Sequence, residues 1–145
     1  TFISSTFWTE RIGFAAGLKT LDVMSETKSW EKICEIGDKV SEYWRKLSQK
    51  YNFDIEISGL RSLKAFNFEK DNQLRKTFIT QQMLKRDFLA SNSLYSSISH
   101  TENLVEKYFC ALGEVFEDLN YYLEKDQLIS IVEGDVSDST FKRLN

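Results

Sequence analysis

The strongest constraint on the fold of this 145-residue sequence is a long run of apolar residues at helical spacing in its first third. From Ser29 onward the run advances by steps of three and four residues, with polar residues in between. It consists of Trp30, Ile33, Gly37, Val40, Trp44, Leu47 and Tyr51. Residues at this spacing share one face of an α-helix. The pattern therefore predicts an amphipathic helix over residues 29–51 that buries one face against another part of the protein.

A second helix is expected earlier, over about residues 9–25, with Thr9 as its N-cap and Glu10 in its first turn. Its apolar positions are Phe14, Leu18 and Leu21. Gly13 and Gly17 lie one turn apart in this helix. Each glycine costs about 1 kcal/mol relative to alanine in a helix interior. We therefore expect another backbone to approach this helix closely.

Helical patterns return in the second half of the sequence. One runs from about Asn72 to Arg86, and a longer one begins after Thr101, which is placed to act as an N-cap. The apolar positions of the longer helix are Val105, Tyr108, Leu112, Val115, Leu119 and Tyr122. The segment "VEGDVSDST" near the end has no such pattern and is expected to be loose.

Period-two alternation marks the expected strands. The segments "DIEIS" (54–58) and "LKAFNF" (63–68) alternate on either side of Ser58-Gly59, and "FLAS" and "LYSSIS" look like short strands separated by a turn at 91–93. The order of helices and strands predicts an α+β fold, with a small, mainly antiparallel sheet covered by helices on one face. A chain of this length forms one domain.

Composition excludes several classes of protein. The net charge is −3, with both signs interspersed, so no basic stripe for nucleic acid is present. The sequence has no apolar run of the length that crosses a bilayer and no secretory signal, so we expect a cytoplasmic protein that contacts no membrane. Cys34 and Cys110 are expected to be reduced core residues. The sequence begins at Thr1 rather than at a methionine, and the apolar pair Phe2-Ile3 follows directly, so we expect a piece of a larger protein.

Motifs for catalysis within the chain itself are missing. His100 is the single histidine, and we expect it to be a hydrogen-bonded residue at a strand end rather than part of a catalytic triad. The spacing of cysteine and histidine predicts no metal site, and no phosphate-binding glycine motif occurs. Glu117 and Asp118 are adjacent on a helix, so their side chains point in different directions and we expect a solvated face. We accordingly predict no catalytic residue.

The opening stretch is the exception, because Ser4, Ser5 and Thr6 precede the start of a predicted helix. Free backbone N–H groups and the helix dipole favour an anion there, and hydroxyls can donate to phosphate oxygens. The arrangement suits a phosphate group. Simple capping of the helix by hydroxyl residues explains the same residues equally well.

Two long blocks resemble a known family. "STFWTERIGFAAGLKTLDVM" resembles the segment that opens the C-terminal small domain of class III pyridoxal-phosphate (PLP) aminotransferases, in the branch close to glutamate-1-semialdehyde aminomutase. "QQMLKRDFLASNSLYSSISHTENLVEKYFCALGEVFEDL" resembles the late strand, His-Thr pair and terminal helix of that family. The resemblance covers essentially the whole chain. It implies that residues 1–145 are the C-terminal small domain, without the large PLP-binding domain.

The resemblance also implies a homodimeric enzyme whose subunits complete each other's active sites. A threonine of the first block donates to the cofactor phosphate of the other subunit, and the matching residue is Thr6, flanked by Ser5 and Phe7. Asn92 matches a position near the substrate where the aminomutase relatives carry a carboxylate, and this change of charge argues against the aminomutase substrate. Phe14 replaces a proline that is usual in the family.

The remaining implied partners lie outside the chain. The lysine that binds PLP, the aspartate that pairs with its ring nitrogen and the glycine-rich phosphate turn belong to the family's large domain. The implied partners are that domain, the second subunit, and a small-molecule amino donor and acceptor. The alternative is a non-catalytic binding or scaffold module derived from such a domain. An upstream reading frame that holds the lysine would distinguish the two.

Overall fold

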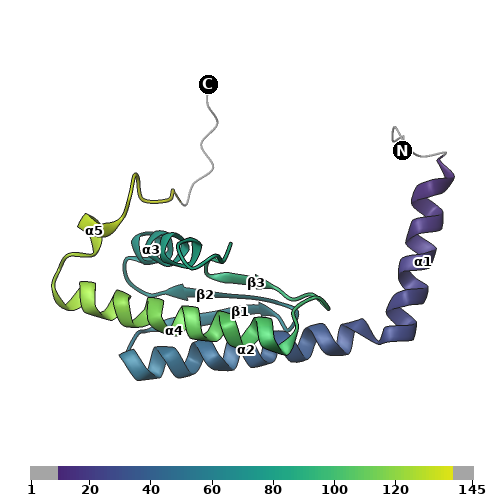
Figure 1. Ribbon diagram of the computed structural model, residues 1–145, viewed down its shortest axis with the longest axis horizontal. Coiled ribbons are helices and arrows are strands. Elements are labelled where there is room, and N and C mark those ends of the chain that lie inside the picture. The colour runs from purple at the N-terminus through teal and green to yellow at the C-terminus, as the bar shows by residue number, and fades with distance from the viewer. Residues whose placement is uncertain (1–9, 139–145) are drawn as a thin grey trace.

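The computed structural model describes residues 10–138, and Figure 1 shows their arrangement. The elements in chain order are α1 (Arg11–Thr27), α2 (Ser29–Tyr51), β1 (Ile55–Leu60), β2 (Leu63–Phe68), α3 (Asn72–Leu84), β3 (Ser93–Tyr95), α4 (Glu102–Glu124) and α5 (Leu128–Ile131). The fold is α+β with a small antiparallel sheet, as the sequence predicted.

The sheet has three strands in the order β1-β2-β3, all antiparallel to their neighbours. β1 and β2 form a hairpin in which Ile55 pairs with Phe68 and Leu60 pairs with Leu63. β3 is short and pairs only with the first half of β2, from Leu63 opposite Tyr95 to Ala65 opposite Ser93. The hairpin confirms the two strands that alternation predicted.

The expected strand at "FLAS" is wrong, because residues 88–91 adopt no strand. The reason lies in the second half of β2. Phe66 N–H donates to the carbonyl of Asn92 (2.9 Å), just before β3 begins. Phe68 N–H, the next donor along the same edge, is taken by Oδ1 of Asn72 in the first turn of α3 (2.9 Å). β2 therefore offers no further ladder donor to residues 88–91.

α2 is the central support of the fold, and it contacts β1, β2 and α4. Its buried residues confirm the predicted apolar face. Trp44 is fully buried, with its ring edge-on to Phe66 at 4.8 Å between centroids. Phe116 of α4 packs against Phe66 and Phe68 from the same side. The helices thus cover one face of the sheet, while Leu60 and Tyr95 on the other face remain exposed.

α1 differs from its prediction. It begins at Arg11 after Glu10, which makes no side-chain cap, and the predicted cap Thr9 lies outside the described residues. α1 has no buried residue, and a Cβ atom built at Gly13 or Gly17 meets nothing within 4 Å. Figure 1 shows α1 leading away from the sheet and the other helices. The neighbour expected at these glycines is therefore not supplied by residues 10–138.

Two smaller expectations also need correction. The tail was expected to be loose, but Glu133 N–H donates to Gln81 Oε1 (2.7 Å) and Ser137 N–H donates to Thr77 Oγ1 (2.9 Å), so α3 holds it through Ser137. Both cysteines are free thiols. Cys110 is exposed rather than part of the core, because it lies on the side of α4 away from Leu112 and Val115.

A search of residues 10–138 found no helix that combines the length and the apolar character needed to cross a membrane.

The approach of α2 to the β1–β2 turn yields a stability prediction. A Cβ atom at Gly37 would lie 1.8 Å from the carbonyl oxygen of Arg61, so Gly37→Ala forces backbone to move. We expect the free energy of unfolding to fall by about 1–3 kcal/mol, measured by urea denaturation. Gly17→Ala is the matched control, because its Cβ meets nothing and alanine favours the helix by up to about 1 kcal/mol. A Gly37→Ala protein as stable as the parent would contradict this packing.

Candidate functional site

The residues predicted to bind the cofactor phosphate, Thr6 and Ser5, lie outside the described residues, as does Phe7. Asn92 is described, and only 8% of it is exposed. Its Nδ2 donates to the carbonyl of Phe66 (2.8 Å) and to Oδ1 of Asn67 (3.3 Å). Its Oδ1 accepts from Ser91 Oγ at 3.3 Å. The amide thus joins the entry of β3 to β2, and its role toward substrate stays a prediction.

His100 lies in the turn between β3 and α4. Its ring Nδ1 accepts a hydrogen bond from the backbone N–H of Ser97 (3.1 Å). Its backbone N–H donates to the carbonyl of Ser97 (3.0 Å). Thr101 follows and accepts from Leu104 N–H (3.3 Å), which confirms it as the N-cap of α4. His100 is therefore hydrogen-bonded, as predicted, but it does not lie at a strand end, because β3 ends at Tyr95 and residues 96–99 of the predicted strand "LYSSIS" adopt no strand. Its imidazole also lines a cavity, which the sequence did not predict.

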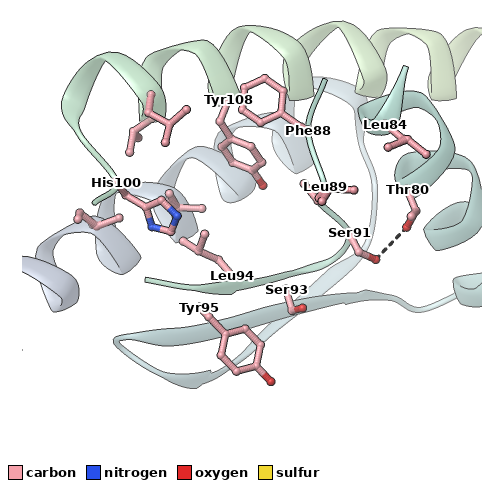
Figure 2. A pocket seen from close by; sticks show the side chains of 15 residues that line it. Thr80, Leu84, Phe88, Leu89, Ser91, Ser93, Leu94, Tyr95, His100 and Tyr108 are labelled. Atoms are coloured by element: carbon pink, nitrogen blue, oxygen red, sulfur yellow. Dashed lines mark hydrogen bonds between the residues drawn. The ribbon is translucent and has the colours of Figure 1, made fainter. Parts of the chain in front are cut away.

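This cavity has a volume of about 570 Å³ and lies beside β3. Its walls come from α2, the end of α3, residues 88–95 and the first turns of α4. Figure 2 shows these side chains, with His100 near one end and the hydrogen-bonded pair Thr80 and Ser91 near the other. Tyr95 points away on the far side of the strand. The cavity therefore lies between β3 and the helices, on the covered side of the sheet.

The end of α3 places the outer wall of the cavity. Asp87 adopts a left-handed conformation (φ 64°), and the N–H of Phe88 returns to the carbonyl of Met83 (3.0 Å). This pattern ends a helix and redirects the chain. Residues 88–91 consequently run along the cavity rather than continuing α3. The wall from α2 is core, with Val40 only 1% exposed, whereas Leu89 at the mouth is 96% exposed.

Few polar groups line the cavity. Tyr108 Oη accepts from the buried Trp44 Nε1 (2.9 Å), and burial raises the pKa of Tyr108 well above its ordinary value. The phenol therefore keeps its proton at neutral pH. Thr80 Oγ1 lies 2.9 Å from Ser91 Oγ. Within the described part of the chain, no Asp, Glu, Lys or Arg lines this cavity. The arrangement suits an apolar molecule with few polar contacts.

PLP does not fit this cavity. The cofactor needs a lysine for its covalent link and cationic or N–H donors for its phosphate. The cavity walls within residues 10–138 provide no lysine and no arginine, and no lysine in that range is buried. The same range contains no cluster of three potential metal ligands. The lining of this cavity within the described residues therefore does not suit PLP.

The carboxylates of α4 correct one expectation. Glu117 is exposed, as predicted for a solvated face, but the neighbouring Asp118 is not free. Asp118 Oδ2 accepts from Arg86 Nη2 (2.8 Å), and Arg86 Nε donates to Glu114 (3.0 Å). Arg86 thereby ties the end of α3 to α4, shortly before residues 88–91, which form part of the cavity wall. No local signal could predict this pair, because its residues are far apart in the sequence.

Comparison with known proteins supports the fold. No family model matches the sequence, and no curated protein matches it. Among solved structures, the FumI protein of Sphingopyxis sp. MTA144, described as its PLP internal aldimine form, superposes with a TM-score of 0.76 at 20% sequence identity. The superposition covers 92% of this chain and 33% of that one. The chain therefore shares a fold with about a third of a longer, PLP-bound protein.

The bonds of Asn92 predict how an acidic replacement behaves. In Asn92→Asp a carboxylate oxygen would face the Phe66 carbonyl, and losing the donor should cost about 1–3 kcal/mol at pH 7. A protonated acid can donate again, so the folded state should raise the pKa of the new carboxyl. The cost should then be small below about pH 4 and grow as pH rises.

Urea denaturation at pH 4 and pH 7 would measure this difference. Asn103→Asp is the control, because Asn103 is exposed in the first turn of α4, where the helix dipole favours an acid. An Asn92→Asp protein with parental stability at pH 7 would show that the amide donor is dispensable.

Proposed function

We propose that this chain is the C-terminal small domain of a PLP-dependent class III aminotransferase or aminomutase, close to glutamate-1-semialdehyde aminomutase-like enzymes. The observation that carries the proposal is the fold shared with FumI over 92% of this chain, since FumI is a PLP-bound protein and this fold makes up about a third of it. The ordered family blocks around Thr6 and His100 point the same way. The enzyme would act in the cytoplasm on a small-molecule amino donor and acceptor.

In this proposal the cofactor is held mainly by a large domain that is not part of the chain. PLP, when bound, supplies the electron sink that amino-group transfer needs. Thr6 and Ser5 would donate to its phosphate in the partner subunit of a homodimer. Asn92, hydrogen-bonded to Phe66 and Asn67, would hold the β2–β3 edge that contributes to the wall of the substrate cleft.

Two uncovered apolar surfaces support the presence of a larger partner surface. α1 exposes Phe14, Leu18 and Leu21, and the outer face of the sheet exposes Leu60 and Tyr95. Contiguous exposed apolar patches in proteins mark interaction sites. The large domain and the second subunit would cover these surfaces.

A second candidate function is a non-catalytic binding module derived from such a domain. The apolar cavity beside β3 favours it, because that cavity is formed entirely by this chain. A genomic reading frame decides between the two. An upstream stretch with the cofactor lysine supports the enzyme, and a start codon directly before Thr1 supports the module.

Thr6→Val in the full-length enzyme tests the cofactor contact. Valine keeps the shape of threonine but loses a hydrogen bond to a charged phosphate, which is worth about 1.5–3 kcal/mol. PLP should therefore dissociate about 10-fold to 150-fold more readily, as measured by equilibrium dialysis with absorbance detection. Thr27→Val, on an exposed residue at the end of α1, should leave PLP affinity unchanged. Equal cofactor affinity in Thr6→Val would remove Thr6 from the site.

The 145-residue chain alone should be catalytically inert. None of its described lysines is buried in a closed site. The hydrogen bond to Tyr51 raises the pKa of Lys50, so this amine stays protonated and is a poor nucleophile near neutral pH. Mixing the chain with PLP and an amino acid should yield no amino transfer beyond that of free cofactor. Stoichiometric modification of one lysine together with faster turnover would overturn both the fragment interpretation and the role of Thr6.

A further inference from the structure

We propose that the cavity beside β3 binds a neutral, mainly apolar small molecule that presents one oxygen acceptor to His100 and Tyr108. Its volume of about 570 Å³ lies within the range of about 300–1,000 Å³ that is usual for ligand pockets. Ile36 and Val40 of α2 and Val105 of α4 form apolar walls for the body of the ligand. This inference does not depend on the proposed function, because the site lies wholly within this chain.

The contact of His100 with the backbone determines which of its ring nitrogens carries the proton. Its Nδ1 accepts the Ser97 N–H, so the proton of the neutral imidazole sits on Nε2. Figure 2 shows the ring turned toward the space between β3 and α4. Within residues 10–138, no group accepts a hydrogen bond from Nε2. His100 therefore offers a free N–H donor to whatever occupies the cavity.

Tyr108 offers the second donor. Its oxygen accepts from Trp44 Nε1, and no described residue accepts the phenolic proton. Figure 2 places this side chain beside the cavity, between His100 and Leu89. A ligand oxygen in the cavity could accept a hydrogen bond from one or both of these groups.

The charge of the walls selects a neutral ligand. The lining within the described range carries no acidic side chain to pair with an amine and no lysine or arginine to pair with a carboxylate or phosphate. A charged head group would lose its hydration without gaining a counter-ion. The hydroxyls of Thr80 and Ser91 are uncharged and bond to each other. An alcohol, ketone, ester or amide with an apolar tail matches this chemistry.

The mouth of the cavity suits the apolar part of the ligand. Leu89 and Leu84 are exposed at the rim, and both are apolar residues that a bound chain would cover. The wall opposite them is core. A ligand would thus place its oxygen at the His100 end and extend its apolar part between α2 and residues 88–91.

The test uses 1-octanol as the probe, with octylamine and octanoate as charged counterparts of the same length. Binding to the 145-residue protein is followed by backbone amide NMR, which reports both affinity and location. We expect saturable one-to-one binding of octanol that shifts the signals of His100, Leu94 and Ala90. Octylamine and octanoate should bind at least 10-fold more weakly at neutral pH.

Two variants locate the site. Ala90→Phe fills the cavity from its wall and should weaken octanol binding at least 10-fold, whereas Ser99→Phe, the same kind of change on an exposed residue outside the cavity, should not. His100→Phe keeps a ring but removes the N–H, so it should weaken octanol binding and reduce its advantage over octanoate. Urea denaturation checks that each variant is folded.

Three results would overturn the inference. The first is the absence of saturable octanol binding to the parent protein. The second is octanol binding by the folded Ala90→Phe and His100→Phe proteins that is as tight as binding by the parent protein. The third is a set of shifts confined to other surfaces, such as the apolar side of α1, which would place octanol there. None of these results bears on whether Thr6 contacts a cofactor.

Discussion

The packing of Trp44 is the interaction on which the rest of the structure depends. This indole is fully buried where α2, α4 and β2 meet, with its ring edge-on to Phe66 and its N–H donated to Tyr108. A buried N–H without a partner is costly, so the bond to Tyr108 specifies how α2 and α4 align as well as how closely they pack. The same contact places the Tyr108 hydroxyl beside the cavity. Core packing and the candidate ligand site therefore share one hydrogen bond.

The cavity exists because the sheet ends early on one side. β2 pairs with β3 over only three residues, since Asn72 takes the N–H of Phe68 and Asn92 occupies the edge near Phe66. Residues 88–91 are thus held away from the sheet, while Arg86 fixes the preceding helix end to Glu114 and Asp118 of α4. α2 and α4 continue past the short strand, and the space between them and residues 88–95 is not filled by side chains of the described chain.

The molecule has two kinds of apolar exposure with different consequences. The cavity is concave, bounded by core residues and equipped with two hydrogen-bond donors, which suits a small molecule. The side of α1 and the outer face of the sheet are not enclosed and carry large apolar residues, which suits a protein surface. The proposed PLP enzyme would use the second kind to join its large domain and partner subunit. The residues that line the cavity all belong to this chain.

Local patterns in the sequence were sufficient for the elements that repeat with a regular period. The stripe of α2, the cap and stripe of α4 and the alternation of the β1–β2 hairpin were all predicted, because each depends on residues that are neighbours in the sequence. The tertiary structure alone decided that "FLAS" is not a strand, that Asn92 bonds to β2, that Asp118 pairs with Arg86, and that His100 and Tyr108 line one cavity. Each of these depends on contacts between residues far apart in the chain, whose hydrogen-bond partners exist only after α2, α3 and α4 have packed against the sheet.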